Sequence, residues 1–375
     1  MSAQHSETDI GILSEEQIRM ASKRPQAHDR KARLGLIGAG WWATTNHLPL
    51  LKARGDVEIA SICSLDEETN ARIQRDFAVP HVTTDYRQLL SQKLDGVVVS
   101  SPHSLHAKHA LAAVDAGCHV MVEKPMTTST TDARRLVSES RKKGLHVLVP
   151  YGWNYRPLSA RAKTLMEQQI VGKIEFVLCH MASPTKSLFA GRSFDYPEGS
   201  YVAPDLSTWS DPAVSHGGYG QGQLSHALGL LTFLCGLRPK SVFARMSNPD
   251  SRVDMYDSLS ISFYDGVIGS VSGAATVPAG AGFQLDIRIF GSRGVLLFDV
   301  ERERLECHTH EGVHRSESVT AGDGAYRCDE PPHQFVELIL GLTDQNNSPG
   351  EVALRAVEIT DAAYRSSQTG VDELV

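Results

Sequence analysis

The chain has 375 residues, of which 41% are hydrophobic, and a formal net charge of -7. This length favours two domains, and the negative charge offers no basic field for nucleic acid or an anionic membrane surface, so neither partner is expected. The six cysteines are scattered and form no CxxC pair, which favours reduced thiols and a cytoplasmic location over a disulfide framework.

Residues 1–30 are mostly polar and lack the apolar segment of a secretory signal, so we expect a mobile N-terminal arm. Within this arm, Ser14 and Gln17 have the spacing of a capping box and predict one short helix. The longest apolar run of the chain, around residues 228–237, is interrupted by Gly and Thr and is too short to cross a bilayer.

Residues 31–150 alternate short β-branched runs with helical stretches, which is the pattern of repeated βαβ units. This pattern predicts an α/β fold of the Rossmann type, with a right-handed, doubly wound parallel sheet that binds a dinucleotide. The strands are expected at LGLIG, VEIASIC, DGVVVSS, HVMVE and HVLVP.

The first of these runs leads directly into Gly38, Gly40 and Ala43, which have the GxGxxA spacing of a dinucleotide-binding turn. Gly38 permits the tight turn, Gly40 lets the backbone approach a diphosphate, and Ala43 lets the helix pack on the strand. We therefore expect this turn, with Trp41 and Trp42 at the start of its helix, to bind the cofactor.

The choice of cofactor depends on the end of the second strand, where Ser64 replaces the acidic residue that normally binds the ribose of NAD. Asp66 can reach the ribose, whereas Ser64 would tolerate the 2′-phosphate of NADP. The acidic cluster at 66–68 would repel that phosphate, and Arg72 and Arg75 lie a helical turn or more further on. NAD and NADP both stay open, with NAD favoured.

Polar side chains follow the later strands, at the sheet edge where a doubly wound fold binds its ligand. A lysine there, partly desolvated beside a nicotinamide, can hydrogen-bond a substrate hydroxyl and stabilise alkoxide character. The alternative for a Lys-Pro pair is an exposed turn without chemistry. The candidate cofactor-binding residues at these strand ends are Ser101, Pro102, His103, His106, Glu123 and Lys124.

Residues 151–375 change to longer alternating strands with Gly-containing turns, which predict a second domain with a largely antiparallel sheet. The segment 184–220 is rich in Pro, Gly, Ser, Asp and aromatic residues and has no periodicity, so we expect a lid over a cleft. A last helix near 352–366 is expected to pack back across a domain, with the first domain as one candidate.

Between the lid and the next strands, a helix is predicted over residues 221–235, ending at Gly236. Its spacing places Gln223 and His226 on one face, so both side chains can meet the same ligand. An imidazole titrates near pH ~6.5 and can exchange a proton at neutral pH. The alternative is a histidine that is satisfied within a packing surface.

Taken together, these segments resemble the Gfo/Idh/MocA family, which includes glucose-fructose oxidoreductase and inositol 2-dehydrogenase. The resemblance implies that the second domain is an α+β domain whose large, open, mostly antiparallel sheet forms the substrate floor, and that the protein is a homodimer or homotetramer. The similar stretches include GLIGAGWWA, SSPHSLHAKHALAAVDAGCHVMVEKPMT, GWNYRP, TWSDPAVSHGGYGQGQLSHALGLLTFLCG, FGSRGVLLFD and GEVALRAVEITDAAYRSS.

The resemblance also assigns roles to single residues. Lys124 matches the family's active-site lysine, Pro125 matches a proline whose peptide bond is often cis, and His226 matches the catalytic histidine that accepts the substrate proton. The segment that would border substrate and nicotinamide comprises Asn154, Tyr155 and Arg156. The lid residues that could stack on a sugar ring, or simply pack, are Tyr196, Tyr201, Trp209 and Tyr219.

The chain departs from the family at Gly222, because many members have an aspartate at this position, four residues before the histidine. We expect Gln223, Ser225 or a group from the lid to replace the missing carboxylate. Five Cys and His residues near a predicted hairpin turn at Glu311 and Gly312 are of types that can bind a transition metal, but their spacing is no familiar zinc pattern, so no metal is expected. That set comprises Cys307, His308, His310, His314 and Cys328.

The predicted function is that of an NAD(P)-dependent oxidoreductase, which transfers a hydride between a secondary alcohol of a sugar, cyclitol or related polyol and nicotinamide. Lys124 and His226 would be the catalytic residues. One alternative is an NAD-dependent enzyme that cleaves glycosides through transient oxidation. Another is a dinucleotide-binding sensor or partner protein without turnover.

Overall fold

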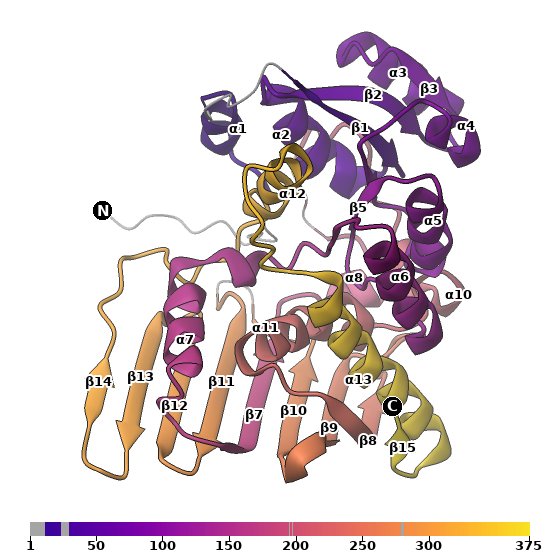
Figure 1. The fold of residues 1–375 in the computed structure, drawn as a ribbon. Helices are drawn as coiled ribbons and strands as arrows, with labels where there is room; N and C mark the ends of the chain where they lie inside the picture. The colour runs from indigo at the N-terminus through magenta and orange to yellow at the C-terminus, as the bar shows by residue number, and fades with distance from the viewer. Residues whose placement is uncertain (1–11, 24–29, 195, 197, 279–280) are drawn as a thin grey trace.

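The computed structural model describes residues 12–23, 30–194, 196, 198–278 and 281–375. Two sheets organise the chain, and Figure 1 shows the first above the second. The first sheet has six parallel strands in the order β3-β2-β1-β4-β5-β6, which confirms the doubly wound Rossmann-type fold. Its strands are β1 (Ala32–Ile37), β2 (Val57–Cys63), β3 (His81–Thr83), β4 (Gly96–Val99), β5 (His119–Val122) and β6 (Val147–Leu148).

Helices cover both faces of this sheet, so its central strands are almost entirely buried, as the apolar run at β4 requires. Phe335 and Ile339 of α12 (Glu330–Leu340) pack against β1 residues, so a late segment of the chain returns to the first sheet. The other helices around the sheet are α2 (Leu48–Ala53), α3 (Glu67–Asp76), α4 (Tyr86–Leu90), α5 (His103–Asp115) and α6 (Thr130–Lys142).

The second sheet has nine strands in the order β14-β13-β12-β11-β7-β10-β9-β8-β15. It is mostly antiparallel, as expected; β7 and β10 are its parallel pair. Every second residue of β9 is buried, because three helices cover one face of the sheet: α7 (Pro157–Glu167), α11 (Ser225–Cys235) and α13 (Gly350–Thr369) (Figure 1).

The nine strands lie in the later part of the chain. They are β7 (Ile174–Ala182), β8 (Pro239–Ser247), β9 (Tyr256–Phe263), β10 (Ile268–Ala274), β11 (Gln284–Gly291), β12 (Gly294–Asp299), β13 (Arg304–Thr309), β14 (His314–Ser316) and β15 (Glu373–Leu374). The short helical elements are η1 (Ala43–His47), η2 (Gly152–Tyr155), η3 (Gly220–Leu224), η4 (Tyr264–Gly266), and, within the predicted lid, α8 (Lys186–Phe189), α9 (Ser207–Ser210) and α10 (Pro212–Ser215).

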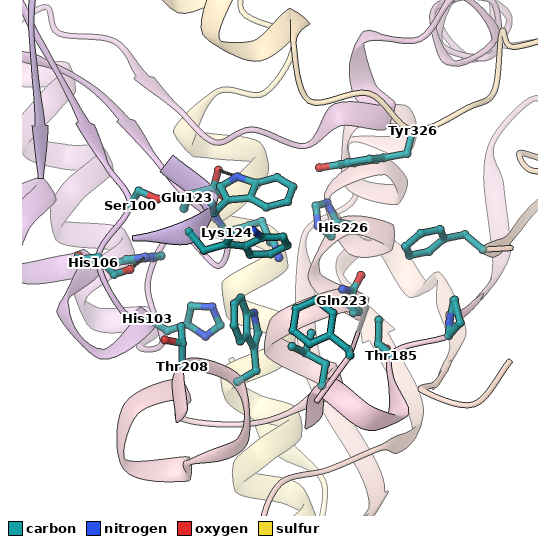
Figure 2. Close-up of a pocket in the computed structure, with 18 of the residues that line it drawn as sticks. Ser100, His103, His106, Glu123, Lys124, Thr185, Thr208, Gln223, His226 and Tyr326 are labelled. Atoms are coloured by element: carbon teal, nitrogen blue, oxygen red, sulfur yellow. Dashed lines mark hydrogen bonds between the residues drawn. The ribbon is translucent and has the colours of Figure 1, made fainter. Parts of the chain in front are cut away.

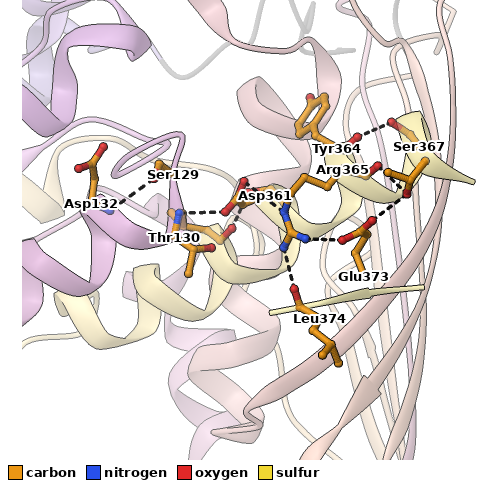
Figure 3. Close-up of polar contacts among 12 residues, drawn as sticks. Ser129, Thr130, Asp132, Asp361, Tyr364, Arg365, Ser367, Glu373 and Leu374 are labelled. Carbon is orange, nitrogen blue, oxygen red and sulfur yellow. Dashed lines mark hydrogen bonds and ion pairs between the residues drawn. The ribbon is translucent and has the colours of Figure 1, made fainter. Parts of the chain in front are cut away.

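The molecule has two halves, one built around each sheet. Helix α13 connects them (Figure 3). Its Asp361 carboxylate accepts a hydrogen bond from the Thr130 backbone N–H at the start of α6, at 3.0 Å. One turn later, Arg365 donates to the Leu374 carbonyl oxygen in β15, at 2.7 Å. The helix is therefore tied to the first half through α6 and to the second sheet through its edge.

Near the N-terminus, the predicted helix is present as α1 (Glu15–Ala21), and Ser14 and Gln17 form the expected capping box. Residues Leu13 and Ala21 pack against Leu50 of α2. The expected mobility of residues 1–11 and 24–29 lies outside the described residues. Among the helices that the structure describes, none is both long and apolar enough to cross a membrane.

Candidate active site

The glycine turn after β1 has the shape that a dinucleotide needs. Gly38 has a φ of +93°, and a Cβ there would lie 2.5 Å from the Ser100 carbonyl oxygen, so only glycine fits. A Cβ at Gly40 would meet no atom within 4 Å, so the backbone is open to an approaching group. The residues of the turn therefore fit a bound diphosphate.

The end of β2 lies apart from the cavity described below. Asp66 caps α3 and accepts hydrogen bonds from the backbone N–H groups of Glu68 and Thr69. The hydrogen bond from the Thr69 side chain, with those from the backbone, lowers the pKa of Asp66 despite partial desolvation. Ser64 accepts a hydrogen bond from the Asp66 N–H at 3.3 Å. The exposed Asp66 carboxylate is therefore ionised at neutral pH.

A single cavity between the two halves collects most of the predicted site residues (Figure 2). Pro102, which precedes α5, is not part of the lining. The predicted residues that line the cavity are Trp41, Trp42, Ser101, His103, His106, Glu123, Lys124, Trp209, Gln223 and His226.

Lys124 enters this cavity from the end of β5. Its Nζ donates a hydrogen bond to the Gly222 carbonyl oxygen of η3, at 2.9 Å, so a residue of the first half contacts the helical segment that carries His226. Burial lowers the pKa of Lys124, and the nearby Glu123 charge opposes that shift. The Lys124–Pro125 peptide bond is cis, as the family resemblance implies.

Glu123, the preceding residue, is held by three donors. His47 Nε2 lies 2.7 Å from Glu123 Oε1, Trp42 Nε1 donates to the same oxygen at 2.9 Å, and the Lys124 N–H donates to Oε2 at 3.2 Å. Burial acts to raise the pKa of Glu123, but the hydrogen bond and charge interaction with His47, together with Lys124, outweigh it and lower the pKa. Glu123 is therefore a fixed anion that orients its neighbours.

His226 lies in the first turn of α11, in an aromatic surrounding. Its ring meets Trp153 and Tyr326 edge-on, with centroids 5.7 and 5.4 Å away. The buried Nδ1 atom has no hydrogen-bond partner among the described residues. Burial, and to a smaller extent the Lys124 charge, lowers the pKa of His226 well below its usual value. The imidazole is therefore neutral at pH 7 and able to accept a proton.

The family's aspartate position has no space for a side chain here. A Cβ on Gly222 would lie 2.9 Å from the Phe189 ring, so that ring occupies the volume a carboxylate would need. Of the predicted replacements, Gln223 lines the cavity, whereas the Ser225 hydroxyl donates to the Gln221 carbonyl oxygen at 2.7 Å.

Two of the three histidines of α5, His103 and His106, are held by backbone carbonyl oxygens. His103 Nδ1 lies 3.2 Å from the Ser215 carbonyl oxygen, which connects α5 to the end of the lid. The His106 ring lies between the carbonyl oxygens of Pro125 and Ser101, at 2.7 and 2.6 Å. Burial lowers the pKa of both histidines. His106 thus fixes the strand end that carries Lys124.

Some predicted residues lie elsewhere. Asn154, Tyr155 and Arg156 do not line the cavity: the Asn154 amide donates to the Asn347 carbonyl oxygen, and Arg156 donates to that of Gly322. Their neighbour Trp153 is the residue of this segment that reaches the cavity.

The predicted aromatic residues of the lid also lie in different places. Tyr219 is fully buried against Phe189 and is a packing residue. Tyr201 docks on α3, where its hydroxyl donates to Asp76 at 3.0 Å and Arg72 stacks over its ring at 4.5 Å. The lid therefore reaches the first half of the molecule beside the Rossmann crevice.

Sequence reasoning missed several lining residues, because their positions in the chain are far apart and follow no motif. The main ones are Trp153, Thr185, Phe194, Thr208, Phe283 and Tyr326.

The histidine-rich hairpin has the form predicted for it, with β13 paired to β14. Cys307 is buried, and His308 and His314 lie side by side with their Nδ1 atoms 3.0 Å apart. Among the described residues, no group of three His, Cys, Asp or Glu side chains is arranged to hold a metal ion.

Comparison with known proteins agrees with this architecture. Residues 32–151 match the profile of the oxidoreductase family with an NAD-binding Rossmann fold, and residues 159–297 match the Gfo/Idh/MocA C-terminal domain. The chain belongs to the Gfo/Idh/MocA family. Its first half is therefore an NAD-binding Rossmann fold.

Two curated relatives illustrate how far the sequence similarity extends. D-xylose 1-dehydrogenase [NADP(+)] of Haloarcula marismortui is 26% identical over 166 residues, which are 43% of this chain and 46% of the relative. Levoglucosan dehydrogenase of Pseudarthrobacter phenanthrenivorans is 25% identical over 297 residues, 72% of this chain and 74% of the relative. For three of the curated relatives, the match spans only about half of their length, from 40% to 57%.

The same fold is found in solved structures of this family. Levoglucosan dehydrogenase in complex with NADH and levoglucosan superimposes with a TM-score of 0.72 at 20% sequence identity, over 92% of this chain and 100% of the other. At this identity, the likeness establishes the shared fold.

Proposed function

We propose that this protein is an NAD-dependent dehydrogenase that oxidises a secondary alcohol of a sugar, cyclitol or related polyol, or reduces the corresponding ketone. The observation that carries this proposal is the meeting of Lys124 and His226, from the two halves of the chain, in one cavity beside the glycine turn. Relatives that act on sugars, among them the xylose and levoglucosan dehydrogenases, support the substrate class.

In the proposed mechanism, a bound nicotinamide supplies the acceptor for the hydride of the carbinol carbon. The residues of this chain handle the proton and the charge. Neutral His226 accepts the hydroxyl proton, and the Lys124 ammonium donates a hydrogen bond to the oxygen as it gains alkoxide character. The Glu123 carboxylate accepts a hydrogen bond from the Lys124 backbone N–H and so holds the backbone of Lys124 in place. In the direction of reduction, His226 returns the proton.

Steady formation of NADH tests this function. The purified protein would be incubated with NAD⁺ and a panel of sugars, methyl glycosides and inositols, and absorbance followed at 340 nm. We expect continuous NADH production with at least one compound. Loss of a glycoside without NADH accumulation, or cofactor binding without any turnover, would contradict the proposal.

We further propose NAD over NADP, because the ionised Asp66 carboxylate at the end of β2 would repel a 2′-phosphate. Arg72, a nearby cation, already donates to the Tyr201 carbonyl oxygen at 3.0 Å and stacks on its ring. NADH is expected to bind at least tenfold more tightly than NADPH, measured by calorimetric titration. An Asp66→Asn variant should narrow that difference, and tighter binding of NADPH by the unmodified protein would refute the assignment.

A further inference from the structure

The cavity is unusually rich in aromatic rings. The chain has four tryptophans, and all four of them, Trp41, Trp42, Trp153 and Trp209, line this one cavity. Phe194, Phe283 and Tyr326 line it as well. Trp41 and Trp42 follow the glycine turn and belong to the cofactor side, so the other five rings face the space left for substrate.

These five rings form two separate walls. The inner wall consists of Trp153, Phe283 and Tyr326, where the Trp153 centroid lies 4.7 Å from Tyr326 and 5.9 Å from Phe283. His226 lies against this wall, and Figure 2 shows Tyr326 next to His226 on the same side of the cavity.

The lid wall consists of Phe194 and Trp209, with centroids 6.4 Å apart. Both rings pack edge-on against Trp41, at 5.7 and 6.1 Å. The lid wall is therefore fixed to the cofactor side of the cavity, while the inner wall belongs to the side of His226.

Polar groups that could bind further hydroxyls are few. Glu123 is the one carboxylate among the lining residues, and Trp42, His47 and the Lys124 N–H occupy its oxygens. The Thr185 hydroxyl pairs with Ser183 at 2.9 Å.

Other polar groups are already assigned to the reaction or to the cofactor side. Lys124 and His226 serve the reacting alcohol, and Ser100 lies at the end of β4, near the glycine turn. The substrate space therefore keeps the polar groups of its own walls, which are the Tyr326 hydroxyl and the indole N–H groups of Trp153 and Trp209, and two residues without an aromatic ring, Gln223 and Thr208. Figure 2 shows Gln223 and Thr208 at the lower side of the cavity.

This balance of groups disfavours a substrate with many free hydroxyls, because each hydroxyl that leaves water without a new partner weakens binding. Aromatic walls instead favour a flat apolar ring, which gains contact area on both faces. We propose that the substrate is a glycoside whose aglycone is an apolar ring, held between the inner wall and the lid wall while a sugar hydroxyl meets Lys124 and His226. This inference rests on the proposed function and specifies its substrate class.

Paired glycosides test the inference. Methyl and phenyl β-D-glucoside, β-D-galactoside and β-D-xyloside would be titrated by calorimetry into the full-length protein saturated with NADH, and their oxidation measured separately with NAD⁺. We expect the phenyl glycoside to bind at least tenfold more tightly than the methyl glycoside in at least one pair, with a similar ratio in kcat/KM.

The outcomes separate the two proposals. Equal binding within every pair, tighter binding of the methyl compounds, or no binding of any compound would overturn the inference, whereas NADH formation would still support the proposed function. Preferred binding of phenyl glycosides without any NADH formation would support the apolar site and overturn the redox function.

Substitutions of wall residues test whether the aglycone binds between the two walls. Trp209→Ala and Phe283→Ala should each reduce the phenyl-to-methyl ratio at least fivefold, and Phe283→Leu provides a milder change if the alanine variant folds poorly. Tyr264→Ala is the matched control, because Tyr264 is a 49% exposed aromatic residue outside the cavity. An unchanged ratio in both wall variants, or the same reduction in the control, would overturn the assignment of the aglycone to these walls.

Discussion

Gly38 and Gly40 differ in what a methyl group would meet at each position. At Gly38, a Cβ would collide with the Ser100 backbone in a left-handed conformation, whereas at Gly40 it would enter open space. The first glycine is thus required by the fold, and the second is required by whatever approaches the turn. The family motif combines a structural and a binding requirement within three residues.

Substitution of each glycine by alanine separates these requirements. Gly40→Ala should leave the thermal midpoint of unfolding nearly unchanged but weaken NADH binding roughly tenfold or more, because the methyl group occupies the diphosphate approach. Gly38→Ala should destabilise the fold by more than about 1 kcal/mol, because its backbone conformation and its neighbours exclude a Cβ. Unchanged NADH affinity in a well-folded Gly40→Ala variant would show that the cofactor lies elsewhere.

The residues that sequence reasoning could predict are those in short, local patterns. Gly38, Lys124 and His226 are examples, since each lies at a fixed place in a strand end or helix. Phe283 and Tyr326 could not be predicted, because only the tertiary fold brings these two residues into the cavity that His226 lines. The family resemblance points to residues 154–156, whereas the side chain of this segment that lines the cavity is Trp153 of η2.

At the scale of elements, α13 carries several of the contacts that join the two halves. Its Glu358 is only 3% exposed and accepts hydrogen bonds from Arg134 of α6, at 2.9 Å, and from Arg355, at 2.8 Å. Near the start of the same helix, Glu351 pairs with Arg141 at 2.8 Å, but both side chains are largely exposed. One helix therefore offers a buried carboxylate and an exposed one to arginines of the same partner helix.

These two pairs predict different effects of truncation. Glu358→Ala should lower the free energy of unfolding by about 1–3 kcal/mol, because it removes three charge-assisted hydrogen bonds, two from Arg134 and one from Arg355, to a buried carboxylate. Glu351→Ala should cost about 0.5 kcal/mol or less, since solvent screens an exposed pair. Urea denaturation measures both, and equal costs for the two variants would contradict the role given to Glu358.

Elements with a strong hydrophobic periodicity could be predicted from the sequence, whereas short or irregular elements could not. The predicted strands at β1, β2, β4, β5 and β6 are present, but β3 has three residues and leaves no pattern to recognise. Helix α12 was not predicted, because two prolines open it and its apolar face packs on the distant first sheet. The lid, predicted to have no regular structure, contains the short helices α8, α9 and α10.

At the scale of the whole molecule, several histidines are buried or partly buried. Burial is the main cause that lowers the pKa of His109 and of His119 to about 4, with nearby positive charges adding to it. His103 and His226 shift in the same direction. In each case the folded protein resists protonation that the unfolded chain accepts.

This difference predicts loss of stability on acidification. Between about pH 6.5 and pH 4 the unfolded chain binds more protons, so the free energy of unfolding should fall as pH decreases, by up to roughly 1.4 kcal/mol per pH unit for each such histidine. Urea denaturation at pH 7.5, 6.5 and 5.5 measures the slope. His109→Gln should reduce it and His314→Gln, on the exposed hairpin, should not; stability that stays constant down to pH 5.5 would contradict the account.

The central claim is that Lys124 and His226, contributed by different halves of the molecule, act on one substrate hydroxyl. It is tested most directly by the kcat/KM for NADH formation in Lys124→Met, His226→Asn and the double variant, with thermal unfolding as a check on folding. We predict that kcat/KM falls about 10²-fold or more in each single variant. The double variant should be little less active than the less active of the two single variants, because the two groups serve the same step. Single variants with unmodified activity, or losses that multiply in full, would contradict the claim.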